Sequence, residues 1–271
     1  MHRILIYHSI GSSSFDEAGA ELYCVTEEKF KAQMRYVSEL PGSRIVESSN
    51  SQTRDILGDA IEPENKPVNS QKVPHRGTGN PQTILITFDD GLLNNYTVAF
   101  KILKELGLKA YFFVLAAKLG EPDYISPLQL KEMKDAGMII GSHGMHHKFL
   151  PELSDIELDY ELKESKQILE HSLGCDIDYL SIPRGFCDNR IIDKAKEAGY
   201  KAVFASYRED SAGFVFGRIS VKYNWNLAHF KNVLNNGLSY REKLEESVKT
   251  VSKKILGPRV YDRIRAAILS R

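Results

Sequence analysis

The chain of 271 residues has few cysteines and no long apolar run. Its three cysteines, Cys24, Cys175 and Cys187, form no C-x-x-C pair, and so sparse a set fits a reducing compartment better than a disulfide-built secreted fold. No stretch approaches the roughly 20 apolar residues that are needed to span a bilayer. The apolar run before His8 is also too short for the core of a signal peptide. We therefore expect a cytoplasmic protein, provided that the chain is complete.

The sequence also lacks an excess of charge of either sign, since 36 Lys and Arg residues balance 36 Asp and Glu residues. A general nucleic-acid-binding protein needs a basic surface, so we expect no nucleic-acid partner. Neither a G-x-G-x-x-G fingerprint nor a P-loop is present, which argues against a nucleotide-binding fold. The hydrophobic content of 42% is enough for a sizeable core in a chain of this length.

What the sequence does contain is a regular alternation of strand and helix patterns. Apolar strand patterns lie at 4–8, 84–88, 109–116, 138–143, 178–183, 200–206 and 213–221, and amphipathic helix patterns at 26–40, 96–107, 126–137, 154–174, 189–199 and 226–237. Strands that are apolar throughout and alternate with helices predict an α/β fold, in which helices cover a parallel sheet. The alternation alone leaves two architectures open, a doubly wound open sheet and a barrel.

Two segments depart from this rhythm. Residues 47–82 are rich in Ser, Asn, Gln, Pro and Gly, which predicts a polar surface insertion within a barrel domain that spans residues 1–238. Residues 239–271 form a predicted helical extension, and the last 24 residues carry seven Lys and Arg residues against one acidic residue. This extension is either a terminal helix docked on the body or a helix that contacts anionic membrane lipid or a phosphate-bearing substrate carrier.

The stretch "ILITFDDG" ends an apolar strand in two adjacent carboxylates, Asp89 and Asp90. Adjacent carboxylates repel each other, but a bound cation favours the ionised form of both. The alternative is a purely structural role for the two aspartates, as a helix N-cap followed by an acidic residue in the first turn. In a barrel, however, the carboxyl ends of the strands are where the chemistry takes place.

A second cluster, "GSHGMHH", follows another strand and contains His143, His146 and His147. His143 and His147 are four residues apart, so both rings face one point if the turn between them is helical. Together with Asp90 they make a set of three protein ligands, which is typical of a catalytic zinc site that keeps one position open. Iron, cobalt and nickel also suit such a set. Taken alone, the histidines could equally belong to a solvated loop.

These two motifs, "TFDDG" followed by H-x-x-x-H, resemble those of the polysaccharide deacetylases, the NodB-like carbohydrate esterase family 4. The resemblance covers about residues 3–235 and implies a distorted (β/α)7 barrel. It also implies that Asp89 is the catalytic base and that Asp90, His143 and His147 hold the metal, usually zinc. The reaction that it implies is the hydrolysis of N-acetyl groups on sugars, which frees an amine and acetate.

The general acid of that reaction is assigned less directly. Many family members use a histidine in a late Leu-x-His motif, and the nearest candidate here, His229, has the helical spacing of a packed or surface residue. The N-terminal "LIYHSIG" is instead similar to the first strand of the circularly permuted poly-N-acetylglucosamine deacetylase branch. That resemblance gives the role of acid to His8. The alternative is a strand-end histidine that bonds to a loop.

Two departures from the family pattern affect the surroundings of the site. Gly144 stands where a Ser or Thr usually follows the first histidine, which weakens any hydrogen bond that supports a metal ligand from this position. The third motif is present as "LSIPRGF", in which Ser181 replaces an arginine and Arg184 replaces an aromatic residue. We expect Pro183, Arg184 and Arg218 to bind substrate, and both arginines are candidate partners of Asp89; Arg218 is similar to an arginine that precedes the last barrel strand in the same branch.

The sequence thus predicts a metal-dependent hydrolase that acts on carbon–nitrogen bonds other than peptide bonds. Its expected substrate is an N-acetylated saccharide of a cell-surface polysaccharide or of a lipid-linked precursor. A sugar O-acetyl esterase on the same scaffold is the first alternative, because an alcohol leaves more easily than an amine. A catalytically silent carbohydrate-binding barrel is the second.

Overall fold

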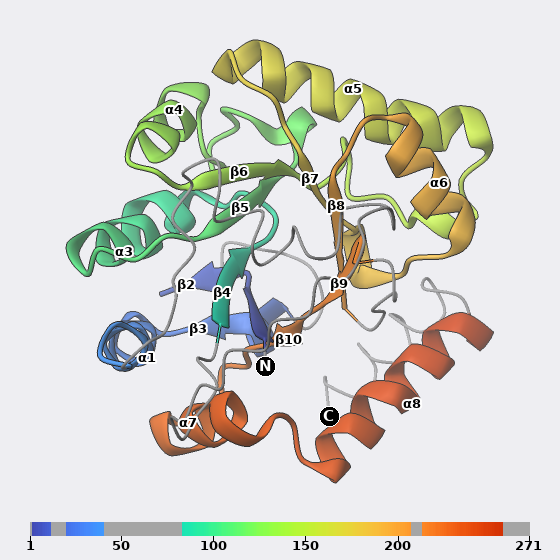
Figure 1. Ribbon diagram of the computed structural model, residues 1–271. Coiled ribbons are helices and arrows are strands. Elements are labelled where there is room, and N and C mark those ends of the chain that lie inside the picture. Colours follow the sequence, from blue (N-terminus) through green and yellow to red (C-terminus); the bar gives the residue numbers. More distant parts are fainter. Residues whose placement is uncertain (1, 12–19, 41–82, 207–212, 257–271) are drawn as a thin grey trace, which may run out of the picture.

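Strand β1 (His2–Tyr7) pairs along its whole length with β4 (Thr83–Phe88), and both strands run in the same direction. The computed structural model describes residues 2–11, 20–40, 83–206 and 213–256 (Figure 1). The predicted insertion at 47–82 and the basic segment beyond residue 256 lie outside these residues. A two-stranded parallel ladder, β2 (Ser9–Ile10) with β3 (Cys24–Val25), lies beside the main sheet.

The main sheet has the strand order β10-β1-β4-β5-β6-β7-β8-β9, and every pair in it is parallel. The remaining strands are β5 (Tyr111–Val114), β6 (Ile139–Ser142), β7 (Tyr179–Ser181), β8 (Ala202–Ala205), β9 (Val215–Gly217) and β10 (Ile219–Ser220). The sequence predicted a single strand at 213–221, and the structure divides it into β9 and β10.

The division of this last strand brings the two edges of the sheet together. Only Arg218 separates β9, which pairs with β8, from β10, which pairs with β1. One nearly continuous segment therefore serves both edges and supplies the seventh strand position of the ring. The sheet curls into the predicted distorted (β/α)7 barrel, and the open doubly wound alternative is wrong.

Apolar side chains fill both faces of the sheet. A small cluster lies inside the ring of strands and consists of Ile4, Leu85, Tyr111, Phe113, Ala202 and Phe204. The alternate residues, such as Phe112 and Val114, belong to the larger core between the strands and the helices. Because both faces are covered, the strands contain continuous apolar runs and no alternation with polar residues.

Helices surround the barrel (Figure 1). They are α1 (Glu27–Ser38), α3 (Lys101–Glu105), α4 (Pro127–Asp135), α5 (Asp155–Leu173), α6 (Asn189–Glu197), α7 (Leu227–Asn236) and α8 (Tyr240–Leu256). Capping boxes begin α4 and α5 and are formed by Ser126 with Gln129 and by Ser154 with Glu157. The predicted helix at 96–107 differs, because its first part, η3 (Asn95–Phe100), is a wider π-type turn.

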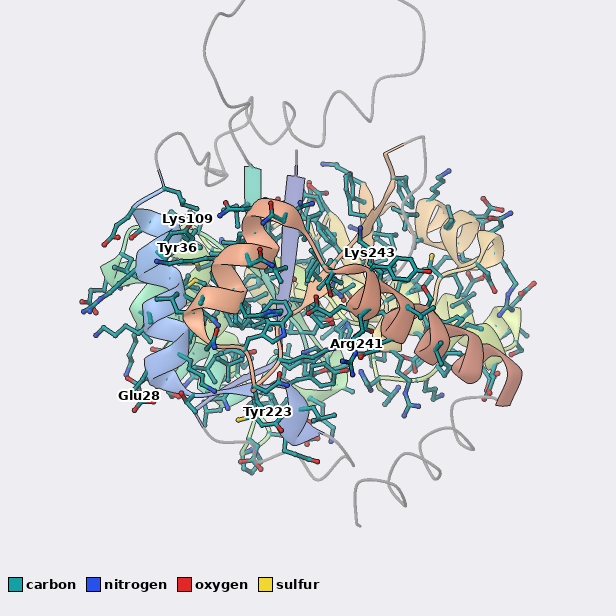
Figure 2. All side chains as sticks on the ribbon, turned by 90° about the horizontal axis from the view of Figure 1, so that it is seen from below. Glu28, Tyr36, Lys109, Tyr223, Arg241 and Lys243 are labelled. Atoms are coloured by element: carbon teal, nitrogen blue, oxygen red, sulfur yellow. The ribbon has the colours of Figure 1, made fainter. Side chains whose placement is uncertain are left out.

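Helix α8 crosses one side of the barrel next to α7, with Arg241 and Lys243 on it (Figure 2). Two contacts attach it to the body: Glu246 forms an ion pair with Lys222 at 2.8 Å, and Glu242 lies 2.9 Å from Nε2 of His229. The described part of the extension is therefore docked on the barrel. None of the helices in the described part of the chain is long and apolar enough to cross a membrane.

Candidate active site

The two aspartates lie at the carboxyl end of β4, and the backbone turns sharply there. Asp90 has a φ of 73° and Gly91 a φ of 72°, so two successive residues adopt the left-handed region. A Cβ atom on Gly91 would lie 2.8 Å from Cγ1 of Val114, which is too close for any side chain. The glycine of "TFDDG" is thus required by both the backbone angle and the neighbouring strand.

Asp90, His143 and His147 converge on one point at this end of the barrel. Their ligand atoms all lie within 4.8 Å of one another, and Oδ1 of Asp90 is 3.5 Å from Nε2 of His143 and 3.6 Å from Nε2 of His147. Oδ1 of Asp90 is buried and makes no hydrogen bond to any described residue. A buried carboxylate oxygen is costly without a partner, and a divalent cation between the three atoms would provide one.

The orientation of the His143 ring is fixed by a hydrogen bond to the backbone. The ring is buried, and its Nδ1 lies 2.9 Å from the backbone carbonyl oxygen of Ser181. Because a carbonyl only accepts, Nδ1 carries the proton, and in the neutral ring Nε2 keeps the lone pair that a metal ligand needs. The donor set therefore fits a metal ion in tautomer as well as in position.

The turn that joins the two histidines is not helical. The sequence had predicted that a helical turn would bring the two rings to one point. Residues 143–148 belong to neither a helix nor a strand. Gly144 (φ 78°) and His147 (φ 58°) adopt left-handed conformations instead. These reversals bring His147 back toward His143, so that the ring centroids lie 5.2 Å apart.

Asp89 lies beside this set and is held by three side-chain hydrogen bonds. Arg218 donates from Nη1 to Oδ1 and from Nη2 to Oδ2, both at 2.8 Å, and Ser181 donates from Oγ to Oδ2 at 2.9 Å. Arg218 also donates to Oγ of Ser181 at 2.7 Å. The serine that replaces the usual arginine of the third motif thus belongs to the network through which Arg218 reaches the carboxylate.

The charges around the aspartates decide their protonation. Burial alone would raise the pKa of Asp89, but Arg218, His143 and His8 outweigh it, so the pKa lies below its usual value. Burial is also outweighed at Asp90, whose pKa the imidazoles of His143 and His147 lower strongly. Both carboxylates are therefore ionised at neutral pH, as a ligand and a base must be.

His8 follows β1, the strand next to β4, at the same end of the barrel. Its ring centroid lies 5.1 Å from that of Tyr23, and its backbone carbonyl accepts a hydrogen bond from Nδ2 of Asn95 at 2.7 Å. Its Nδ1 atom is buried and has no hydrogen-bond partner in the described part of the chain. The fully buried Asn95, which makes this bond, was not predicted as a site residue.

The third motif forms a tight turn next to the histidine loop, residues 143–148. Arg184 adopts a left-handed φ of 61°, and the neighbouring Pro183 is buried, with its ring 3.7 Å from where a Cβ of Gly144 would be. Asp90, His147 and Arg184 are the non-glycine residues with positive φ in the described ranges. Such strain is concentrated at functional sites, and here it gathers in three loops at one end of the barrel.

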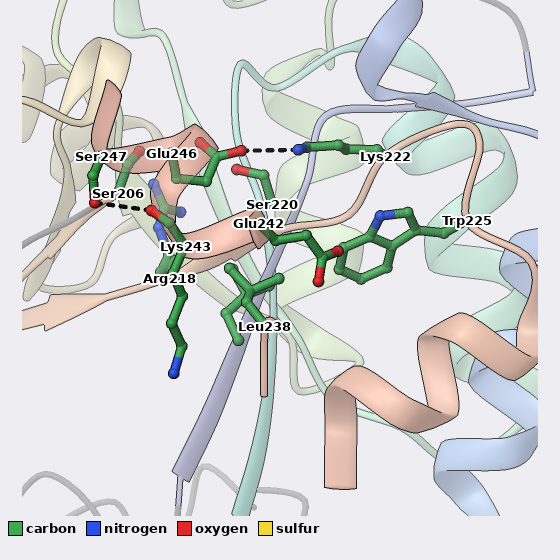
Figure 3. A pocket seen from close by; sticks show the side chains of 11 residues that line it. Ser206, Arg218, Ser220, Lys222, Trp225, Leu238, Glu242, Lys243, Glu246 and Ser247 are labelled. Carbon is green, nitrogen blue, oxygen red and sulfur yellow. Dashed lines mark hydrogen bonds and ion pairs between the residues drawn. The ribbon is translucent and has the colours of Figure 1, made fainter. Parts of the chain in front are cut away.

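A cavity of about 550 Å³ lies behind Arg218, between α8 and β10 (Figure 3). Trp225, Leu238, Glu242 and Glu246 line it together with Arg218. Arg218 is only 5% exposed, so its guanidinium separates this cavity from Asp89. The described part of the extension thus forms one wall of a space that ends at the partner of Asp89.

Comparison with known families agrees with this geometry. Residues 76–203 match the family model described as polysaccharide deacetylase. A peptidoglycan-N-acetylglucosamine deacetylase of Bacillus cereus is 30% identical over 132 residues, which are 48% of this chain and 60% of that protein. The peptidoglycan-N-acetylmuramic acid deacetylase PdaA of Bacillus subtilis is 31% identical over 132 residues, 48% of this chain and 49% of that protein. The chain thus spans about half to three fifths of the length of these relatives.

A solved structure has the same fold over nearly its whole length. The Streptococcus pyogenes deacetylase PplD, in complex with acetate, superposes with a TM-score of 0.69 at 24% identity and covers 88% of this chain and 98% of its own. At this level of identity the likeness shows the fold alone. Because it covers 88% of this chain, it extends the match beyond residues 76–203 in both directions along the sequence.

Proposed function

The chain contains a polysaccharide deacetylase domain, and from this premise we propose that it hydrolyses N-acetyl groups of a saccharide and releases acetate. The observation that carries the proposal is the position of Asp89. This carboxylate is fixed by Arg218 and Ser181 directly beside the Asp90–His143–His147 set. Amide hydrolysis needs a base that lies next to an electrophilic centre.

Asp90, His143 and His147 would hold a divalent cation, with zinc as the first candidate and cobalt, nickel or iron as alternatives. When bound, such a cation polarises a carbonyl group and lowers the pKa of water. The three residues would keep the ion at the carboxyl end of the barrel, where a substrate from solvent could reach it.

Asp89 acts as the base that takes the proton of the attacking water. Its lowered pKa keeps it ionised at neutral pH and thus able to accept a proton. Arg218 donates to both of its oxygens and Ser181 donates to Oδ2, which holds the carboxylate in one orientation. Because Arg218 stays charged throughout, it also stabilises the ionised form between turnovers.

His8 delivers a proton to the leaving amine. An amide anion is too poor a leaving group to depart without one, so N-deacetylation needs a general acid opposite the base. His8 is near enough to Asp89 and Asp90 for its charge to lower the pKa of both carboxyls. Its contact with the ring of Tyr23 restricts the orientation of the imidazole.

The substrate that we propose is a saccharide of the cell surface or its lipid-linked precursor. Two relatives are named for N-acetylglucosamine and N-acetylmuramic acid in peptidoglycan, which supports an N-acetylated sugar. Pro183 and Arg184 line the turn next to the histidine loop and are the residues that we propose to contact the sugar. The guanidinium of Arg184 suits an anionic or phosphate-bearing group.

We also propose that the barrel at 1–238 acts at the inner face of a membrane through the extension at 239–271. Tyr240, Leu244 and Val248 are 83%, 51% and 55% exposed and recur every four residues along α8, so they form one apolar stripe. The sequence that follows is rich in Lys and Arg. An apolar stripe that is followed in the sequence by basic residues suits the anionic cytoplasmic leaflet of a membrane.

Acetate release from N-acetylated oligosaccharides tests the activity. We expect release by the metal-loaded protein and a loss of about 10³-fold or more in the Asp89→Asn variant, because an amide cannot accept the proton. Equal release by the variant would refute the assigned mechanism. Release from O-acetylated sugars alone would indicate the esterase alternative, and a protein that binds the sugar without releasing acetate would be the silent barrel.

A further inference from the structure

Glu161, on helix α5, carries a carboxylate that the sequence pattern did not single out. The side chain is fully buried, at 0% exposure, and a buried carboxylate is costly unless it is hydrogen-bonded. The partners of this carboxylate belong to the histidine loop, which we define as residues 143–148. Oε2 accepts the backbone N–H groups of Met145 at 2.9 Å and His146 at 3.0 Å.

The second oxygen of Glu161 is used as well. Oε1 lies 2.8 Å from Nδ1 of His146, which must donate because a carboxylate only accepts, and 3.7 Å from Nζ of Lys148. On the other side of the loop, the carbonyls of Gly144 and Met145 accept from two backbone N–H groups after β5, those of Ala116 and Ala117. The loop is therefore bonded from both sides although it has no regular secondary structure.

The backbone of the histidine loop needs such support. His147 adopts a φ of 58°, a conformation that costs of order 1 kcal/mol or more for a residue with a side chain. Strained conformations persist only where the surrounding structure determines them. Gly144 fits the same arrangement, because its φ of 78° favours glycine and a Cβ there would be in contact with Oε2 of Glu161, at 3.4 Å.

We infer that Glu161 is a positioning residue that presets the second histidine ligand, His147, for the metal. His143 is held independently, by β6 and by the carbonyl of Ser181. The two N–H groups that Glu161 accepts directly precede His147, and no strand or helix holds this part of the loop. Hydrogen bonds to a carboxylate are about twice as strong as neutral ones, so the loop is ordered before an ion arrives.

This inference rests on the proposed function in one respect, namely that Asp90, His143 and His147 bind a metal. The experiment is a Zn²⁺ titration of the metal-free protein against a competing chelator, for the wild type, Glu161→Gln and Glu170→Gln. Glu170 is a matched control, because it lies on the same helix and accepts the N–H of Ile177 at 3.0 Å, away from the histidine loop. Each variant is also loaded with Co²⁺, and its visible spectrum is recorded.

We expect Glu161→Gln to raise the Zn²⁺ dissociation constant by about 10- to 100-fold and to change the Co²⁺ spectrum, whereas Glu170→Gln matches the wild type. A dissociation constant and a spectrum unchanged in Glu161→Gln would overturn the inference while leaving the metal site intact. A wild type that binds no zinc would refute the proposed function itself, and the inference with it.

A second measurement needs no variant and decides the matter if Glu161→Gln does not fold. Hydrogen exchange of the Met145 and His146 amides is followed in the wild-type protein with and without Zn²⁺. Slow exchange in both states is expected from a loop that Glu161 orders in advance. Fast exchange that becomes slow only with Zn²⁺ would show that the ion orders the loop, and it would overturn the inference.

Discussion

Arg218 forms a two-point ion pair with Asp89, with both N–O distances at 2.8 Å and the arginine almost completely buried. This geometry matches the planar fork of a guanidinium to the two oxygens of a carboxylate. Arg218 is the single residue between β9 and β10, where the barrel closes. The orientation of the proposed base and the closure of the sheet therefore depend on the same position.

Arg218→Lys should reduce the deacetylation rate while leaving zinc binding in place. A lysine keeps the charge but cannot donate to both oxygens of Asp89, so we expect kcat to fall by about 10- to 100-fold. Steady-state kinetics and metal content are the measurements. Arg190→Lys is the matched control, because Arg190 pairs with Asp155 outside the site. A kcat equal to the wild-type value in Arg218→Lys would contradict the assigned role.

Removal of the metal should abolish activity and lower thermal stability. The three ligand groups lie within 4.8 Å of one another, and without an ion the buried Oδ1 of Asp90 has no partner among the described residues. Dialysis against a chelator, followed by readdition of Zn²⁺, should remove and then restore both activity and melting temperature. His147→Ala should hold no metal, whereas His171→Ala, on the exposed side of α5, should hold about one ion per chain. Full activity after chelation would refute the metal site.

The motifs at the carboxyl ends of the strands could be found from the sequence because they are local. "TFDDG" and the spaced histidines each follow an apolar strand, and parallel strands bring their ends together. The capping boxes of α4 and α5 are local as well, since each joins residues that are three positions apart in the chain. What depends only on neighbours in the chain was therefore accessible without a structure.

Apart from Arg218, which was a candidate partner of Asp89, the supports of the site were not accessible in this way. Glu161 lies 16 positions beyond Met145, in a helix whose sequence shows an ordinary amphipathic pattern. From the sequence, Ser181 was recognised only as a replacement of the usual arginine. Its hydrogen bonds to Asp89 and Arg218 were not predictable, because these residues are 92 and 37 positions away. The break at Arg218 likewise arises from closure of the barrel, which no local pattern encodes.

The free energy of unfolding should fall in alkali because of Tyr200. This hydroxyl donates to the carbonyl of Leu162 at 2.9 Å, and burial raises the pKa of Tyr200 to about 12. A raised pKa means that the folded state holds the proton more tightly. Its contribution is thus complete below about pH 10, where the unfolded tyrosine titrates, and is lost as the pH rises through about 12, by at most about 1.4 kcal/mol per pH unit.

Tyr200→Phe isolates this effect. Below pH 10 the variant should be less stable by about 1 kcal/mol, since it removes the hydrogen bond from Tyr200 to the Leu162 carbonyl, to which only Ser165 then donates from a side chain among the described residues. Toward pH 12 the difference from the wild type should shrink, because phenylalanine does not titrate. Urea unfolding between pH 8 and 12 measures both curves, and a difference that stays constant over this range would show that Tyr200 does not titrate as inferred.

Vesicle binding tests the apolar stripe of α8. Leu244→Glu should weaken sedimentation with phosphatidylserine-containing vesicles by about tenfold or more, since burial of one leucine is worth about 1.5–3 kcal/mol. Leu128→Glu is the matched control, because Leu128 is 82% exposed on α4. Equal loss in both variants, or no binding by the wild type, would mean that α8 contacts no membrane.

His8→Ala should separate the two reactions that the scaffold could catalyse. An amine cannot leave without a proton, so we expect N-deacetylation to fall by about 10²- to 10⁴-fold, whereas ester hydrolysis should fall much less because an alkoxide leaves more readily. The two substrates are compared on one preparation, so that metal content is the same for both. His229→Ala is the control, since His229 pairs with Glu242 on α8 and packs against Trp225. Parallel losses on amide and ester would indicate that His8 supports the site without donating the proton, and loss of N-deacetylation in His229→Ala instead would move the role of acid to that residue.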